Sequence, residues 1–589
     1  MTTIAKLLTE HMAIWTAADT VKKSGRGRAS GNAGSVYGVK KLRELILELA
    51  VRGKLVPQDP NDEPASELLK RIQAEKAKLI AEGKLKKEKP LAPINDDEKP
   101  FDLPKGWDYA SFGDVVEIVR GITFPGSEKS KTPEKGRIAC LRTSNVQDQI
   151  EWEDILYIKE QFVSRENQLL KPNDIVMSMA NSRELVGKVA LVGNEVKEKT
   201  TFGGFLGVIR PYTISPKFVL TLLRTPPTRE ALIDNASQTT NIANISLAKL
   251  KPLFFAIPPL AEQHRIVAKV DELMALCDQL EQQHSNAQEA HETLVSQLLD
   301  TLTQSQNAAE FNANWQRIYA HFDVLFTTEA SIEALKQTLL QLAVMGKLVP
   351  QDPNEEPASE LLKRIQAEKA KLIAEGKLKK EKPLAPISED EKPFELPKGW
   401  DWVRVCQLFN VISGGSFEVS QEKETGEYMY IKVADMNLEE NSVDIVTSSR
   451  YINPTEKQMN GLIPPNSIIF PKRGGAIATN KKRLIKTHTF VDLNIMAITV
   501  PSSVALQYVY QWLNGIDLAK LNTGTSVPQI NHQDIDPLVF PLPPIAEQHR
   551  IVAKVDALMA LCDQLKTRIQ QANQQQQAIA DALVAQAVE

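Results

Sequence analysis

The stretch "PPLAEQHRIVAKVDELMALCDQL" at residues 258–280 returns at residues 543–565 as "PPIAEQHRIVAKVDALMALCDQL". After each AEQHR, apolar residues recur in alternating steps of four and three, a pattern that predicts one long helix with a single apolar stripe. The stripes comprise Ile266, Val270, Leu273, Cys277, Leu280, His284, Ala287, His291, Leu294 and Leu298, and Ile551, Val555, Leu558, Cys562, Leu565, Ile569, Ala572, Gln576, Ile579 and Leu583. We therefore expect the two helices to pack together, antiparallel, as a coiled-coil spacer.

A second repeat precedes each copy of the first. "GKLVPQDPNDEPASELLKRIQAEKAKLIAEGKLKKEKPLAPI" at residues 53–94 returns at residues 346–387 with one change, Asp62 to Glu355. The acidic pair before Pro64 and the glycine at Gly83 predict a helix between them. Its mostly charged surface fits either a solvated face or a face that docks a partner. The repeat ends in "PKGW" at 104–107 and 397–400.

The repeats enclose two inserts, residues 104–257 and 397–541, that share only scattered features, such as "LLKPNDIVMS" (169–178) against "LIPPNSIIFP" (462–471). Plain drift after a duplication would leave inserts and flanks equally alike. Near-identical flanks around unlike inserts instead favour two copies of one docking surface that carry two different reading heads. The first head is residues 104–257 and the second head is residues 397–541. The expected segments are 1–38 (flexible, partly helical), 39–103 (helical), 104–257, 258–396 (helical spacer), 397–541 and 542–589 (helix). The fold class is α+β with a pseudo-twofold internal repeat.

Composition narrows the class of protein. A chain of 589 residues has room for several domains. The four cysteines lie far apart, which favours reduced thiols in the cytoplasm over a disulfide framework. No apolar run reaches the roughly 18 residues that span a bilayer, so we expect no membrane association. The net charge of −4 gives no global case for nucleic acid, and any DNA binding must come from local patches.

The sequence lacks the motifs of a self-contained DNA enzyme. It has no phosphate loop for a nucleotide and no Asn/Asp-Pro-Pro-aromatic motif of an amino-methyltransferase. It also has no acidic pair followed by Glu-x-Lys that would suggest a nuclease metal site, and no G-x-S-x-G turn. His284 and His291 stand one heptad apart, too far to share a metal ion, and fit register-setting positions better. A methyltransferase or nuclease acting alone is therefore disfavoured. A coiled-coil scaffold that reads no DNA is the other alternative.

The order of these parts resembles the specificity subunit of type I restriction–modification systems, over nearly the whole chain from about residue 40. The resemblance rests on PKGW, on PP-x-AEQHRIVAKVD and on "LIPPNSIIFPKRGGAIATNKKR" at 462–483. The duplicated GKLVPQDP block is most similar to the IB subfamily. Residues 1–38 carry little of the resemblance.

The resemblance implies a fold and a set of partners. Each insert would be a target recognition domain of mixed α/β fold that reads one half of a bipartite, asymmetric site in double-stranded DNA. The repeated helices would separate these domains and bind two modification (methyltransferase) subunits, and two restriction (translocase and nuclease) subunits would join them. The chain itself would be non-catalytic and hold no cofactor. S-adenosylmethionine, ATP and Mg²⁺ would be bound by the partner subunits.

Candidate DNA contacts are polar side chains clustered within the inserts. Arg, Asn and Gln can pair with base edges, whereas Lys, Ser and Thr mostly hold phosphates. The candidates are Arg142, Thr143, Asn145, Gln147, Asn181, Arg183, Gln238 and Asn241 in the first insert, and Lys472, Arg473, Thr479, Asn480, Lys481, Lys482, Arg483, Thr525, Gln529 and Asn531 in the second. Lys472 and Arg473, beside Gly474 and Gly475, stand out because bare backbone lets DNA approach closely. No metal-binding residues are predicted.

Overall fold

The computed structural model describes residues 11–16 and 36–588, apart from 88, 184, 195, 197–198, 235, 239–242, 377, 379–383 and 522–527. The chain divides into two compact units. Unit 1 comprises Met1–Ala287 with Ala572–Glu589, and unit 2 comprises Gln288–Gln571. Both boundaries fall within the long helices α9 (Leu260–Thr303) and α17 (Ile545–Val588), so each helix begins in one unit and ends in the other.

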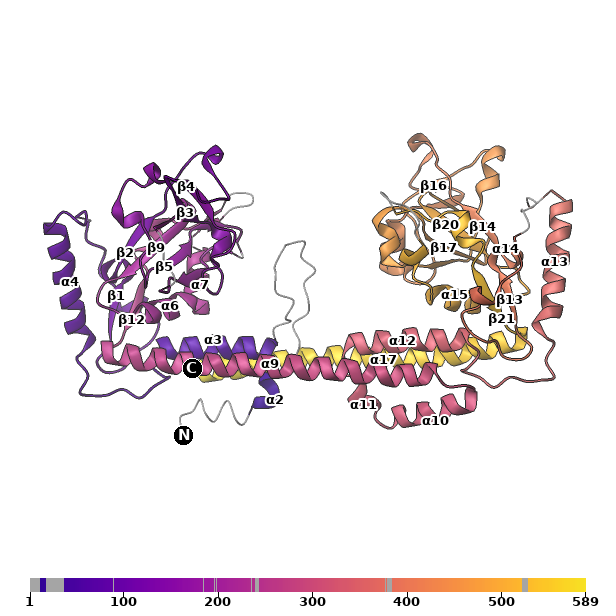
Figure 1. The fold of residues 1–589 in the computed structure, drawn as a ribbon, viewed down its shortest axis with the longest axis horizontal. Helices are drawn as coiled ribbons and strands as arrows, with labels where there is room; N and C mark the ends of the chain where they lie inside the picture. Colours follow the sequence, from indigo (N-terminus) through magenta and orange to yellow (C-terminus); the bar gives the residue numbers. More distant parts are fainter. Residues whose placement is uncertain are drawn as a thin grey trace. The chain divides into compact units, whose positions relative to one another are not determined.

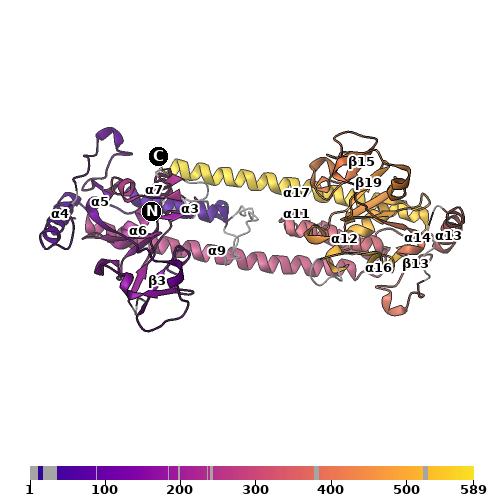
Figure 2. The same cartoon turned by 90° about the horizontal axis from the view of Figure 1, so that it is seen from above.

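Three helices form the base of each unit. In unit 1, α3 (Tyr37–Val51) lies between the start of α9 and the end of α17, as Figure 2 shows. Arg43 of α3 donates to Asp278 of α9 at 2.7 Å, and Tyr37 donates to Asp581 of α17 at 2.9 Å. In unit 2, α12 (Glu329–Val344) takes the place of α3, and its Lys336 donates to Asp563 of α17 at 2.5 Å.

The other helices that the structure describes lie outside these three-helix bases, and several of them belong to the heads. In unit 1 they are α2 (Met12–Trp15), α4 (Ala65–Ala81), α5 (Phe112–Val115), α6 (Pro216–Arg224), α7 (Pro226–Asp234) and α8 (Leu247–Leu250). In unit 2 they are α10 (Ala308–Tyr319), α11 (Phe322–Leu325), α13 (Ala358–Ala374), α14 (Val405–Leu408), α15 (Leu506–Asn514) and α16 (His532–Ile535). Helix α4 begins after Pro64 and ends before Gly83, which adopts a φ of 70°, so its predicted limits are confirmed.

The first head holds four small sheets (Figure 1). Their strand orders are β2-β9-β5-β7, β4-β3-β8, β1-β12 and β10-β11-β6. The strands are β1 (Asp108–Ser111), β2 (Val116–Arg120), β3 (Arg137–Leu141), β4 (Leu156–Lys159), β5 (Ile175–Ser178), β6 (Ala180–Asn181), β7 (Val189–Leu191), β8 (Thr200–Phe202), β9 (Leu206–Pro211), β10 (Ser237–Gln238), β11 (Ala243–Asn244) and β12 (Phe254–Ile257).

The second head repeats three of these sheets as β14-β20-β17-β18, β16-β15-β19 and β13-β21. Its strands are β13 (Asp401–Arg404), β14 (Asn410–Ser413), β15 (Tyr428–Ile431), β16 (Tyr451–Ile452), β17 (Ser467–Pro471), β18 (Arg483–Ile485), β19 (Thr489–Val491), β20 (Ile495–Thr499) and β21 (Val539–Leu542). Strand pairing matches as well, since β3 with β8 and β15 with β19 are the parallel pairs.

The scattered likeness of the inserts thus conceals one common fold. Asn173 and Asn466, from the two aligned segments quoted above, both adopt left-handed backbone angles, with φ of 70° and 61°. Asn173 N–H donates to the Val192 carbonyl and Asn466 N–H to the Ile485 carbonyl. The expected α+β architecture with an internal repeat is confirmed, and the repeat extends through the heads.

The apolar stripes are confirmed over their first halves only. Ile266, Val270, Leu273 and Cys277 are buried, as are Ile551, Val555, Leu558 and Cys562. Farther along, the predicted positions Leu294 and Ile579 are exposed, and burial shifts by one residue to Val295 and Ala580. The far end of each helix packs into the other unit's three-helix base, where it meets α12 or α3, so a strict heptad register is not required there.

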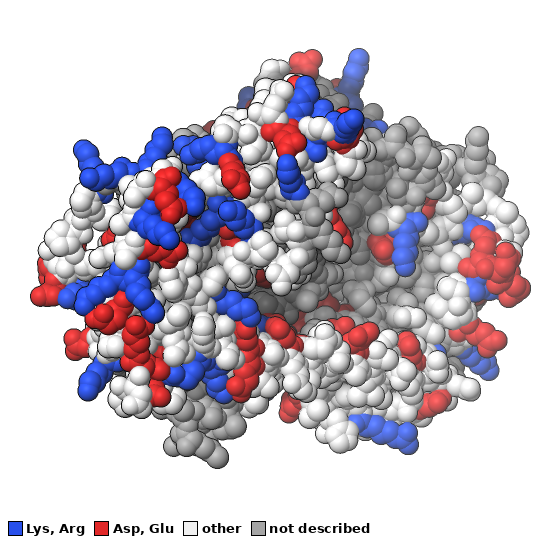
Figure 3. Space-filling view, turned by 60° about the vertical axis from the view of Figure 1, so that its left-hand side comes forward, with Lys and Arg blue, Asp and Glu red and all other residues white. Residues whose placement is uncertain are grey.

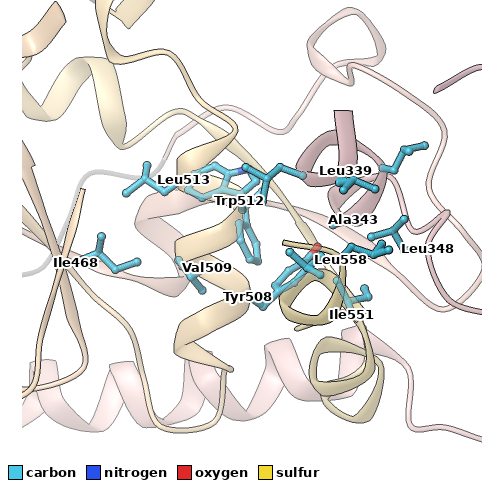
Figure 4. Packing of buried hydrophobic residues seen from close by; sticks show 14 of the residues in the cluster. Leu339, Ala343, Leu348, Ile468, Tyr508, Val509, Trp512, Leu513, Ile551 and Leu558 are labelled. Carbon is cyan, nitrogen blue, oxygen red and sulfur yellow. The ribbon is translucent and has the colours of Figure 1, made fainter. Parts of the chain in front are cut away.

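The core of unit 2 joins head to base. In Figure 4, Tyr508, Val509 and Trp512 of α15 lie between Ile468 of the sheet and the helical residues around Leu339 and Ile551. Tyr508 is fully buried, and its hydroxyl donates to the Pro541 carbonyl at 3.0 Å. Helix α15 therefore fixes the sheet above α12 and α17 in this unit.

The two sequence repeats meet at each head's point of attachment. The indole of Trp107, from PKGW, donates to the buried carboxylate of Glu262, from AEQHR, at 3.0 Å. Gln58, from the GKLVPQDP block, donates to the same carboxylate at 3.1 Å. Trp400 and Gln351 make the same bonds to Glu547, at 2.9 and 3.1 Å. Each head is therefore anchored by the same three side chains.

The single substitution within the 42-letter repeat falls at this attachment point. Arg265 of AEQHR donates to Asp62 at 2.6 Å, and its counterpart Arg550 is paired with Glu355. Aspartate and glutamate carry the same charge, so the change preserves the ion pair.

Candidate nucleic-acid interface

A hollow of about 580 Å³ opens at one edge of the first head. Arg120 at the end of β2 and Met179 after β5 line it, together with Asn244 of β11. The turn between β8 and β9 adds Phe205, which is 65% exposed. Exposed aromatic, amide and guanidinium groups at one concave edge can stack on bases, pair with base edges and hold phosphates.

A close backbone crossing fixes this edge in both heads. A Cβ at Gly121 would lie 2.1 Å from the Gly203 carbonyl oxygen, and one at Gly414 would lie 2.0 Å from the Asp492 carbonyl oxygen. Only glycine fits such an approach. The signal is present in the sequence as "RGITF" at 120–124 and "SGGSF" at 413–417. The sequence interpretation above missed it, and with it Arg120, Phe205 and Asn244.

The second head forms the corresponding edge from residues 472–475 and 528–532. Ile530 N–H donates to the Lys472 carbonyl at 2.9 Å, and Arg473 forms a β-bridge with Gln529. Arg473 is exposed, whereas Lys472 is largely buried and burial lowers its pKa. Lys472, Arg473, Gln529 and Asn531, which come from two separate sequence clusters, thus lie together at this edge.

The first-head candidates differ in how accessible they are. Arg142 and Thr143 line the hollow, although Arg142 is also bound to the carboxylate of Asp154 at 2.8 Å. Gln147 accepts a hydrogen bond from Lys188, and Asn181 accepts one from Ser182 N–H. Arg183 is exposed.

For two candidates of the first head, the structure describes no side chain. The backbone of Gln238 pairs with Ala243, and nothing is described of its side chain. Asn241 lies outside the described residues.

Asn145 is a correction to the prediction. Its side chain is 2% exposed and donates to the carbonyls of Glu151 and Glu153 at 3.0 and 3.1 Å. It also accepts from Arg142 N–H at 2.9 Å. Asn145 therefore braces the loop after β3, and its amide is not available to bases.

The stretch from Thr479 to Arg483 is largely structural. Thr479 is exposed, but its hydroxyl donates to the Ala476 carbonyl at 2.7 Å. Asn480 has a φ of 53° and accepts from Leu518 N–H, while Lys481 donates to Asn437. Arg483 donates to the carbonyls of Lys482 and Met436.

Lys482 is the second correction. It is 1% exposed and donates to Asn480 Oδ1 and the Ile516 carbonyl, both at 2.7 Å. A lysine in that position ties two loops together and cannot reach DNA.

The last candidates of the second head lie near helix α16. Asn531 caps this short helix, and its side chain accepts a hydrogen bond from Gln529, so both side chains already have a partner. Thr525 lies outside the described residues.

The buried Lys482 should make the stability of the folded chain depend on pH. Burial lowers its pKa to about 7, against about 10.4 in an unfolded chain. Between these values the unfolded chain binds more protons, so the free energy of unfolding rises with pH, by up to about 1.4 kcal/mol per unit. Relative to Lys482→Met at the same pH, the natural chain should gain about 2 kcal/mol between pH 7 and pH 9 in urea unfolding. Lys457→Met, at an exposed lysine, should show no such drift.

The charge of the heads is mixed. In Figure 3, lysine and arginine side chains alternate with aspartate and glutamate over the described surface of the face in view. Among the residues the structure describes, no group of three or more His, Cys, Asp or Glu side chains is placed to hold a metal ion. None of the described helices is long and apolar enough to cross a membrane.

Comparison with known proteins gives a consistent picture. The family described as "Type I restriction modification DNA specificity domain" matches residues 104–289 and 397–574. The specificity subunit of the type I restriction enzyme EcoAI of Escherichia coli is 42% identical over 99% of this chain and 100% of its own length. The EcoEI specificity subunit of the same organism is 40% identical over 98% of this chain and 99% of its own length.

Proposed function

Because the chain belongs to the type I restriction–modification DNA specificity family, we propose that each head reads one half of a bipartite, asymmetric DNA site. The chain supplies sequence specificity and is not itself the catalyst. The half-sites would lie at a separation set by the helices that carry the heads, and they would differ because the heads differ.

The observation that carries this proposal is a shared backbone with unlike side chains at one exposed edge. Both heads bring the segment after β5 or β17 beside the segment before α8 or α16. The matched residues are Met179 and Ala180 in one head and Lys472 and Arg473 in the other. The two heads thus share a backbone arrangement at this edge but present different side chains, as the recognition of two different DNA sequences requires.

The partner surfaces are proposed on the repeated flanks. Helices α4 and α13 have the same 17 residues, of which only three are buried in each copy, Ala65, Leu68 and Ile72 or Ala358, Leu361 and Ile365. Lys76 and Lys369 contact the heads, but most of the other identical side chains are exposed. Binding two copies of the same modification subunit would explain why these exposed side chains are the same. Two restriction subunits would complete the complex. S-adenosylmethionine would be bound by the modification subunits, and ATP and Mg²⁺ by the restriction subunits.

The direct test is to map modified bases in DNA exposed to the chain reconstituted with its modification subunits. The proposal expects two short, unlike sequences at a fixed separation. Modification or cleavage by the isolated chain would instead identify a self-contained enzyme. Modification without any sequence preference would indicate a scaffold that reads no DNA.

The isolated chain is expected to bind DNA weakly. Basic and acidic side chains are interspersed on the face shown in Figure 3, and backbone phosphates supply much of the affinity of DNA-binding proteins. Gel-shift titration at one salt concentration should show at least about tenfold tighter binding when modification subunits are present. Equal, tight binding by the chain alone would contradict this expectation.

A further inference from the structure

Hydrogen bonds establish which residues of the two heads occupy the same place. Met179 N–H donates to the Phe205 carbonyl, and Lys472 N–H donates to the Asn494 carbonyl. Ile245 N–H donates to the Met179 carbonyl, and Ile530 N–H donates to the Lys472 carbonyl. These paired bonds make Met179 equivalent to Lys472 and Ile245 equivalent to Ile530, independently of any sequence alignment.

The bridging strands extend the equivalence by one residue on each side. Ala180 pairs with Asn244 across β6 and β11, and Arg473 forms the matching bridge with Gln529. Residues directly opposite each other in such a pair project from the same face. Each head therefore presents one two-residue corner, Ala180 with Asn244 or Arg473 with Gln529.

The two corners differ in size and in hydrogen-bonding groups. Asn244 is exposed and lines the hollow of the first head, while the methyl group of Ala180 offers no polar atom beside it. Arg473 is exposed, and no hydrogen bond or ion pair of its side chain occurs among the described residues. The amide nitrogen of Gln529 donates to Asn531 at 2.7 Å, which leaves Arg473 as the main donor of its corner.

Base edges discriminate between these groups. An asparagine amide matches the N6 donor and N7 acceptor of adenine, whereas a guanidinium matches the O6 and N7 acceptors of guanine. The exposed guanidinium of Arg473 is the accessible cationic group of this corner, and it directly follows the largely buried Lys472. In the first head the equivalent residue is the apolar Met179.

We propose that these corners are equivalent base-reading positions, at which Asn244 selects an A·T pair in one half-site and Arg473 selects a G·C pair in the other. The assignment rests on the proposed function and adds to it the base class at one position of each half-site. It also adds Asn244 to the residues that determine specificity.

The test compares modification-site maps of complexes containing Arg473→Ala or Asn244→Ala with that of the natural chain. Arg473→Ala should relax the preference at one G·C pair of a single half-site by about 5- to 150-fold, the range that follows from 1–3 kcal/mol per bidentate pair. Arg473→Lys keeps the positive charge but loses the paired donors of the guanidinium, so it should relax the preference at the same base pair. Asn244→Ala should relax one A·T pair in the other half-site.

Matched controls lie just after edge strands of the two four-stranded sheets. Asn194 follows β7 and Lys486 follows β18, both exposed, and alanine at either position should leave the maps unchanged. A uniform loss of modification across all sequences in Arg473→Ala would overturn the proposal and make Arg473 a phosphate contact. Relaxation in both half-sites, or at the opposite base pair type, would also overturn it.

Failure of the proposal and failure of the proposed function give different results. If the natural complex shows no bipartite site, the proposed function is wrong. If it shows one and the variants leave it unaltered, only the assignment of Asn244 and Arg473 is wrong.

Discussion

A chain in which a second copy of residues 397–541 replaces residues 104–257 should direct modification to a site with two identical half-sites. Each insert ends at the same anchor, in which a PKGW tryptophan donates to an AEQHR glutamate. The backbone of Gly113 accepts from Lys76 of α4, and that of Cys406 accepts from Lys369 of α13, so the transplanted head finds its supporting contacts. Modification at the natural asymmetric site should fall at least about 100-fold, since several base pairs become mismatched at once.

The reciprocal exchange is the control for this chimera. Residues 104–257 in both positions should yield a site built from the other half-site, again duplicated. Circular dichroism and co-purification with modification subunits should be unchanged in both chimeras. Unaltered sequence preference in either one would contradict the assignment of specificity to the heads.

Loss of the anchor carboxylate should have the largest effect on stability. Glu262→Ala removes the acceptor of both Trp107 and Gln58. Gln58 is exposed and also donates to the Gly53 carbonyl at 2.7 Å, so the buried indole of Trp107 is the donor left without this acceptor. An unsatisfied buried group costs about 1–3 kcal/mol, and unit 1 should lose about that much stability. Glu262→Gln, which keeps one carbonyl acceptor, should lose less.

Urea unfolding of the full chain, combined with hydrogen exchange, locates the effect. Faster exchange should be confined to unit 1 in Glu262→Ala and to unit 2 in Glu547→Ala, because each glutamate belongs to one anchor. Burial raises the pKa of both carboxyl groups, against the opposing effect of their tryptophan partners. A stability of Glu262→Ala within 0.5 kcal/mol of the natural chain, roughly the range of ordinary surface substitutions, would show that the anchor is dispensable.

The helical parts of the fold could be predicted from local signals. Pro64 and Gly83 mark the ends of α4, and the regular apolar spacing after AEQHR marks α9 and α17. The partner of each apolar stripe could not be predicted in this way. Val295 and Ala580 take over from the predicted Leu294 and Ile579 because α12 and α3 pack there, and those contacts are distant in sequence.

The candidate interface was harder to predict, because residue type does not reveal exposure. Asn145 and Lys482 have side chains suited to DNA, yet both are buried and bind backbone carbonyls. Asn244 carries equally suitable chemistry but lies three residues beyond Asn241, the last candidate of its polar stretch. Only the pairing of β11 with β6 brings it to the edge where Arg120 and Phe205 lie.

The exchange of helix ends between units also governs the order in which the protein can fold during synthesis. The core of unit 1 includes Ala580 of α17, and the partly buried Leu583 and Val584 pack against it, but the ribosome makes these residues only after all of unit 2. Unit 1 can therefore complete its packing only after unit 2 has been synthesised.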